Sequence, residues 1–326
     1  MVRPWFKRFS LLARICSVTL HSTHSSGQNG LPRILTMIKG LLVNGFGLMV
    51  LAASLYAITD ITLKFLSASF PLTEIAFIRF LTGLIILWPI LYSQGISVRG
   101  NRTRILILRG IFGTLSFFCL IKSIAMIPLA NAIILFYTFP IFVALFSFLL
   151  FGEKIKKEVL GLIAVGLLGT YILINPASHS FNRGTVFGLL SSCLGGMAMV
   201  LIHRARQTNG PLIIYFYFCL MGGIFSFPFL VQNFKMPNAG QWILLISFGW
   251  LVLIGQLLMN QGFKFCKAAE GSLIMMSELV FTGIAGIFIF KDPVTPNFLI
   301  GAFLIVGSGA GLNLIHRRSL AQNRIT

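Results

Sequence analysis

Long apolar runs follow one another along most of this chain, and short polar breaks separate them. A helix needs about 20 predominantly apolar residues to cross the hydrocarbon core of a bilayer. Residues that end helices, such as Pro71, Gly152 and Pro211, stand in the breaks. The pattern therefore predicts an all-α integral membrane protein with ten transmembrane helices. We place these helices at residues 41–63, 73–93, 105–124, 129–151, 158–175, 184–203, 212–231, 241–262, 271–290 and 297–315.

The two halves of this pattern resemble each other at a nearly constant offset, which pairs Pro71 with Pro211 and Gly161 with Gly301. Residues 148–173 and 287–315 both read as an apolar run, a Phe, an acidic residue in a polar break and a Gly-rich apolar run. A match that persists across most of each half indicates an internal repeat of five helices.

A unit of five helices crosses the membrane an odd number of times, so the second copy is inverted relative to the first. Inverted repeats permit alternating access, and their substrate sites lie at the repeat interface near the bilayer midplane. The predicted organisation is a first five-helix repeat at 37–180, a second at 181–316 and a cytoplasmic tail at 317–326.

Residues 1–36 differ from the rest, because they carry five basic residues, no acid and many Ser and Thr residues. This composition is typical of a transit peptide. The alternative, which we favour, is an upstream start codon, with Met37 as the true beginning. Both interpretations leave this N-terminal extension outside the folded body.

Composition and charge support a membrane protein. The chain is 56% hydrophobic and only 10% charged, with a net charge of +19. With the amino end inside, fourteen loop Lys and Arg residues fall on the inner side and five on the outer side. Because cytoplasmic loops carry an excess of Lys and Arg, we expect a bacterial inner-membrane protein with both termini cytoplasmic. No basic cluster with interleaved aromatic residues lies outside the apolar runs, so nucleic acid is not an expected partner.

The sequence offers no catalytic or metal-binding motif. The five cysteines form no CxxC pair, and we expect them to be small packing residues. No GxxxxGK[ST], HExxH or GxSxG pattern occurs. We therefore expect no cofactor and no metal, and a membrane-embedded enzyme is the less favoured class.

Three segments carry a resemblance to a known family. They are PLANAIILFYTFPIFVALFSFLLFGEKI (128–155), AEGSLIMMSELVFTGIAGIFIFKDPVTP (269–296) and PLTEIAFIRF (71–80). With them the chain resembles the EamA-type ten-helix permeases of the drug/metabolite transporter superfamily. Such permeases often have Glu–Pro in the ninth helix, where Glu278–Leu279 keeps the Glu and lacks the Pro.

The resemblance implies a secondary transporter that moves a small organic metabolite across the membrane by alternating access, with proton coupling as one option. Export of amphipathic drugs or toxic metabolites is the alternative. The expected partners are a small-molecule solute and membrane lipid, with a homodimer as a further option.

Charged residues inside the spans are the first candidates for a site, since they usually face the bundle interior or a water-filled cavity. Glu278 lies inside the ninth span and suits a proton or cation site, unless it only bonds a neighbouring helix. Arg79 lies inside the second span, where similar permeases often have an arginine, and Asp60 or Glu278 are candidate partners. Asp60 could instead form a structural i,i+4 pair with Lys64.

Polar and kinked positions add further candidates. Tyr137 and Pro140 lie in the fourth span, where proline frees a backbone carbonyl and permits a kink that would help gating. Gln256 and Asn260 lie one turn apart in the eighth span and suit substrate contact. Helix–helix hydrogen bonding explains this pair equally well.

The remaining acidic residues are expected to be structural. Glu153 and Asp292 fall in the two matching polar breaks, where we expect them to fix the loop or cap the following helix. Glu74, near the start of the second span, is expected at the membrane interface.

Overall fold

The computed structural model of the chain describes residues 45–322, apart from 128, 154, 175–181 and 291–293. The N-terminal extension at 1–36 and Asp292 lie outside these residues. Every regular element in the described part is a helix, which confirms the all-α class. The helices are α3 (Gly45–Ser67), α4 (Leu72–Ser93), α5 (Thr103–Ile124), α6 (Leu129–Phe136), α7 (Phe139–Phe151), α8 (Lys157–Ile174), α9 (Arg183–Ala205), α10 (Pro211–Asn233), α11 (Ala239–Gly262), α12 (Ala268–Met275), α13 (Ser277–Phe290) and α14 (Pro296–Gln322).

The helices follow the ten predicted spans. Eight described segments are long and apolar enough to cross a bilayer, and Pro296–Leu312 within α14 is a shorter apolar helix. The helix α8, of 18 residues, covers the fifth predicted span. The fourth and ninth spans differ from expectation, because each consists of two short helices.

The two broken spans interrupt the backbone at matching places. The fourth is broken between α6 and α7, at Tyr137 and Thr138. Pro140 lies in the first turn of α7, where the missing N–H leaves no helical hydrogen bond unmade. The ninth is broken between α12 and α13 at Met276. There the Met276 N–H donates to the carbonyl of Leu273 at 3.2 Å, a tight turn that needs no proline.

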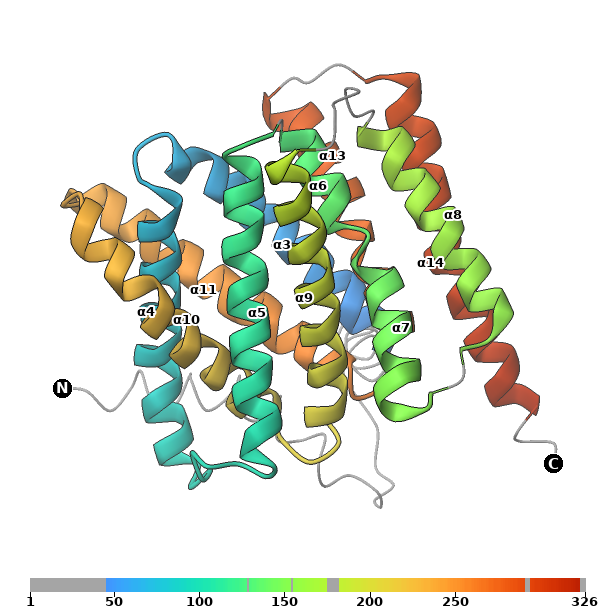
Figure 1. Cartoon of the computed structure of the whole chain (residues 1–326), viewed down its shortest axis with the longest axis horizontal. Coiled ribbons are helices and arrows are strands. Elements are labelled where there is room, and N and C mark those ends of the chain that lie inside the picture. The colour runs from blue at the N-terminus through green and yellow to red at the C-terminus, as the bar shows by residue number, and fades with distance from the viewer. Residues whose placement is uncertain (1–44, 128, 154, 175–181, 291–293, 323–326) are drawn as a thin grey trace, which may run out of the picture. The chain divides into compact units, whose positions relative to one another are not determined.

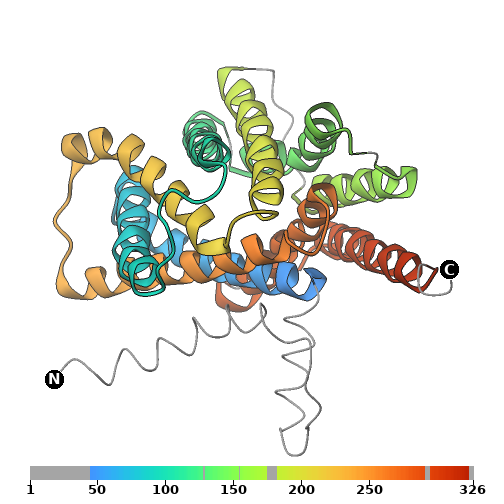
Figure 2. The ribbon, with the colours of Figure 1, turned by 90° about the horizontal axis from the view of Figure 1, so that it is seen from below.

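Most helix pairs join one repeat to the other (Figures 1 and 2). The helix α5 packs along α9, and α3 packs along α11. Exchanging the two halves converts the first pair into the second. The same exchange converts α5–α10 into α4–α11 and leaves α4–α10 and α8–α14 as they are. The repeats are therefore related by a local two-fold, and the core lies between them.

Close glycine contacts fix which positions of the two repeats correspond, a pairing that we call the repeat register. A Cβ atom on Gly83 would lie 2.5 Å from the Cys219 sulfur, and one on Gly222 would lie 2.5 Å from the Phe80 ring. The register that pairs Gly83 with Gly222 also pairs Phe80 with Cys219, so each contact is the two-fold counterpart of the other.

Three more pairs of glycine contacts obey the same register: Gly110–Met221 with Gly249–Thr82, Gly45–Phe265 with Gly184–Met126, and Gly195–Ser116 with Gly255–Tyr56. This register differs by one position from the offset that paired Pro71 with Pro211, since it places Pro71 on Gly210. The structure therefore confirms the repeat and refines its alignment.

Polar side chains tie the turns of one repeat to loops of the other. The Asn209 side chain exchanges two hydrogen bonds of 2.7 Å with the backbone of Asn101. At the start of α4, a Glu74 side-chain oxygen accepts from the Lys235 N–H at 3.1 Å. Glu74 is only 1% exposed, and its side chain links the start of α4 to the segment that follows α10.

Candidate functional site

A cavity of about 270 Å³ lies between the two repeats, and helices from α3 to α7 and from α9 to α13 line it. Its wall follows the repeat register, so positions related by the two-fold face the same space. The chemistry of the paired positions differs, because a charged or polar residue from one repeat is matched by Met or Phe from the other. The pairs are Asp60–Met199, Arg79–Phe218, Arg109–Phe248, Gln256–Phe117 and Glu278–Phe139.

Two carboxyl groups stand together on one side of the cavity. A carboxylate oxygen of Asp60, on α3, accepts a hydrogen bond from the Thr282 hydroxyl of α13 at 2.9 Å. Glu278 lies in the first turn of α13, where the positive end of the helix dipole favours an anion. The Asp60 and Glu278 carboxyl groups lie within hydrogen-bonding reach of each other. The break in the ninth span therefore places an acid in the cavity.

The break in the fourth span faces the same acid. Tyr137, which separates α6 from α7, lies within hydrogen-bonding reach of Glu278. The helices α7 and α12 are also in contact. The two interrupted spans thus meet at the cavity, one supplying a hydroxyl and the other a carboxyl group.

Two arginines lie against the aromatic part of the wall. The Cζ atom of Arg79 is 4.4 Å from the centre of the Phe117 ring, and that of Arg109 is 4.2 Å from the centre of the Phe218 ring. Such cation–π contacts are favourable, most of all when desolvated. Arg109 also donates to the Gln256 side-chain oxygen at 3.4 Å. Within the described residues, neither arginine forms an ion pair with a carboxylate.

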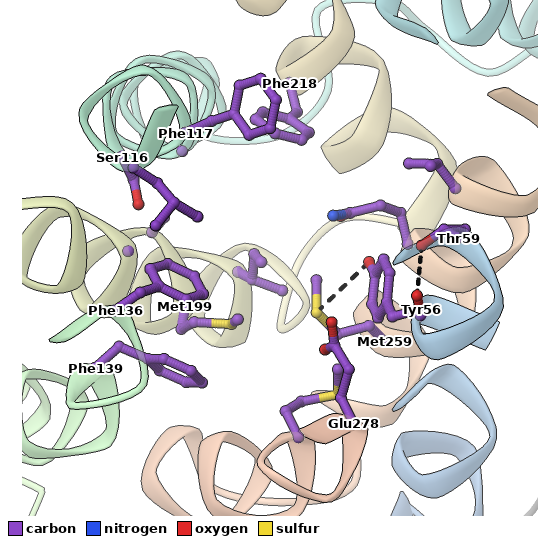
Figure 3. Close-up of a pocket in the computed structure, with 18 of the residues that line it drawn as sticks. Tyr56, Thr59, Ser116, Phe117, Phe136, Phe139, Met199, Phe218, Met259 and Glu278 are labelled. Atoms are coloured by element: carbon purple, nitrogen blue, oxygen red, sulfur yellow. Dashed lines mark hydrogen bonds between the residues drawn. The ribbon is translucent and has the colours of Figure 1, made fainter. Parts of the chain in front are cut away.

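Aromatic and sulfur-containing side chains complete the wall (Figure 3). Phe136 and Phe139 stand on one side of the space and Tyr56 on another. The Tyr56 hydroxyl contacts the Met259 sulfur at 4.0 Å. Tyr56 shares the cavity wall with the two acids and the two arginines. The cavity is thus mostly apolar, with a few charged groups at defined places.

Five of the predicted site residues meet at this cavity: Glu278, Arg79, Asp60, Tyr137 and Gln256. The predicted kink residue, Pro140, lies in the first turn of α7, next to the break.

Asn260 lies elsewhere and is not among the described lining residues. It is fully buried, its side chain donates to the Pro211 carbonyl at 3.4 Å, and its backbone carbonyl accepts from Arg206 at 2.9 Å. This placement fits the helix–helix alternative.

Sequence reasoning missed two residues of the site. Arg109, inside the predicted span 105–124, is 3% exposed and lines the cavity. Tyr56 was not singled out. The sequence did contain a signal for Arg109. A basic residue inside an apolar run has an unfavourable free energy of membrane insertion unless it faces a cavity or the bundle interior. For metal ions, the described residues contain no cluster of three or more His, Cys, Asp or Glu side chains.

Comparisons with known proteins agree on one family. The model of the EamA-like transporter family matches residues 43–175 and again 182–314. The pseudopaline exporter CntI of Pseudomonas aeruginosa is 30% identical over 83% of this chain and 96% of its own length. An S-adenosylmethionine uptake transporter of Rickettsia felis is 23% identical over 86% of this chain and 96% of its own. A solved crystal structure, 20% identical, matches the fold with a TM-score of 0.71 over 86% of this chain and 98% of that one.

Proposed function

We propose that this chain, which belongs to the EamA-like transporter family, is a secondary transporter that works by alternating access. Its family and relatives make it a multi-pass membrane transporter of small molecules rather than an enzyme. The observation that carries the proposal is the cavity between the repeats, at which both interrupted spans meet. In transporters of inverted repeats, such discontinuous helices form the substrate and coupling-ion sites.

The two-fold contacts support the exchange of conformations. The close glycine contacts between the repeats occur in pairs, and swapping the halves converts one member of a pair into the other. Inward-open and outward-open states can therefore use the same set of interfaces and lie close in energy. With both termini in the cytoplasm of a bacterium, the loop between α7 and α8 would face inward.

We assign proton coupling to Asp60 and Glu278. Two buried carboxyl groups within reach of each other cannot both carry a charge without strong repulsion, so one proton is readily held between them. Opening to a compartment of different pH would allow that proton to leave or enter. Thr282 and Tyr137 supply the hydroxyl partners that keep the two groups in place.

Export of amphipathic compounds is the second candidate. The rings of Phe117, Phe136, Phe139 and Phe218 line much of the cavity (Figure 3), and aromatic walls bind apolar groups of many shapes. Of the relatives, one is named for export and another for uptake, so the direction of transport must be measured.

Reconstitution tests the proposal. Purified protein in liposomes with an imposed pH gradient would be offered a mixture of amino acids, S-adenosylmethionine and riboflavin, and the lumen would be analysed by mass spectrometry. We expect at least one solute to move, and Glu278→Gln to abolish gradient-driven accumulation while the protein still inserts. The matched control is Glu158→Gln, since that acid is exposed at the start of α8. Undiminished accumulation by the Glu278 variant would contradict the coupling role, and no movement in either direction would contradict transport.

A further inference from the structure

The two arginines of the cavity hold buried N–H groups that no described residue accepts. These groups are Nε of Arg79 and both Nε and Nη1 of Arg109. Buried donors in folded proteins are nearly always hydrogen-bonded, so each exception needs an explanation. Arg109 is only 3% exposed, and both residues line the cavity. Their donors therefore point to a group that binds there during transport.

The contacts of the two arginines with aromatic rings indicate the chemistry of the group that binds them. A guanidinium that lies over an aromatic ring uses its face, while its N–H donors lie in its own plane. Arg79 lies over Phe117 and Arg109 over Phe218, so the rings hold both cations without using their donors. Planar, forked donors of this kind match a carboxylate, which accepts two parallel hydrogen bonds. An anionic group is therefore the fitting acceptor.

The acids stand apart from this anion-binding side. Figure 3 shows Glu278 across the cavity from Phe117 and Phe218, the rings that hold the arginines. Within the described residues, no arginine nitrogen lies within ion-pair distance of the Asp60 or Glu278 oxygens. Because buried charges are normally paired, a cavity with separated positive and negative sides favours a ligand that carries both signs.

Resting on the proposed function, we propose that the transported solute is a zwitterion. Its carboxylate binds Arg79 and Arg109, and its ammonium group binds the Asp60–Glu278 side. A proton held between the two acids still leaves one negative charge, which matches one ammonium group. A cavity of about 270 Å³ lies near the lower end of ligand pockets, which measure about 300–1,000 Å³, so the solute is of amino-acid size or somewhat larger. The phenylalanine rings favour an apolar or aromatic side group.

Matched sets of probes test this inference on the purified wild-type protein. Each set holds an amino acid, its decarboxylated amine and its deaminated acid: L-phenylalanine with phenethylamine and hydrocinnamate, L-tryptophan with tryptamine and indolepropionate, and L-leucine with isoamylamine and isocaproate. A ligand that binds only the folded protein raises its Tm by mass action. We expect at least one amino acid to raise the Tm, and both of its analogues to bind at least about thirtyfold more weakly, because each leaves a buried charge without its partner.

Arginine variants test whether the carboxylate end of the solute binds the two arginines. In Arg109→Gln the amino acid should lose its advantage over the corresponding amine, whereas in Arg104→Gln, an exposed position at the start of the same helix, the advantage should remain. If Arg109→Gln does not fold, Arg79→Gln gives the same comparison at the second donor. If no amino acid raises the Tm more than both of its analogues do, the inference is overturned. If amines or acids alone bind and are transported, the proposed function stands and the zwitterion inference fails.

Discussion

The position of Arg109 can be changed without changing its charge, through Gly113 one turn further along α5. A Cβ atom on Gly113 would lie 2.1 Å from Nη1 and 3.3 Å from Cζ of Arg109, and 3.0 Å from the Phe218 ring. Ordinary contact begins near 3.4 Å. In Gly113→Ala the guanidinium must therefore move by more than about 1 Å from its place over the ring.

We expect this displacement to lower the affinity for the solute much more than it lowers the stability of the protein. The displaced contact with Phe218, at 4.2 Å, is a cation–π interaction worth about 0.5–2 kcal/mol. The side chain is flexible, so part of that energy is recovered in the new position. Misplacing a binding group by about 1 Å can cost roughly 100-fold in the function it serves. We therefore expect a small drop in Tm and a loss of roughly 10- to 100-fold in affinity for an amino acid.

Binding measurements on the variant separate position from charge. Gly113→Ala should weaken the amino acid that stabilises the wild-type protein and leave the corresponding amine unaffected, since the amine does not use Arg109. The control is Gly223→Ala, whose added methyl group would meet only a Leu84 carbon at 3.7 Å. Wild-type affinity for the amino acid in Gly113→Ala would refute the role of Arg109 as a carboxylate ligand.

Two further substitutions test the interfaces between repeats. Gly301→Ala would place a methyl group 2.6 Å from the Gly169 carbonyl oxygen, where α8 meets α14. It should destabilise the protein by about 1–3 kcal/mol, seen as a lower Tm, whereas Gly307→Ala on the same helix meets nothing within 4 Å and should not. Asn209→Ala removes both 2.7 Å bonds to the α4–α5 loop and should cost about 1–3 kcal/mol, with faster hydrogen exchange in that loop. The exposed neighbour Gln207→Ala should change neither, and equal Tm values within either pair would contradict the corresponding contact.

The spans and the repeat could be predicted because they depend on the local apolar pattern. A helix that crosses a bilayer needs about 20 apolar residues, so each span is a long and clear signal. The rarity of charges inside the spans also pointed to Glu278 directly. Other features depend on tertiary neighbours. Gln256 and Asn260 lie one turn apart on α11, yet the first faces the cavity and the second lies against Pro211 at the start of α10. The break at Met276 has no proline to announce it. Periodicity identifies a shared face, but not what stands opposite each turn of that face.

The two repeats share the scaffold of the cavity but not its charged side chains. Positions that the repeat register pairs share the wall, but the counterparts of the four charged residues are all Met or Phe. Duplication has therefore preserved the scaffold and not the chemistry. If the protein works by alternating access, as proposed, the balance between inward-open and outward-open states depends on contacts present in both halves, such as the paired glycine contacts. Recognition of the solute then depends on side chains present once. Substitutions at the charged residues should consequently alter affinity and coupling while leaving the conformational balance near its wild-type position, because no symmetric pair of contacts is lost.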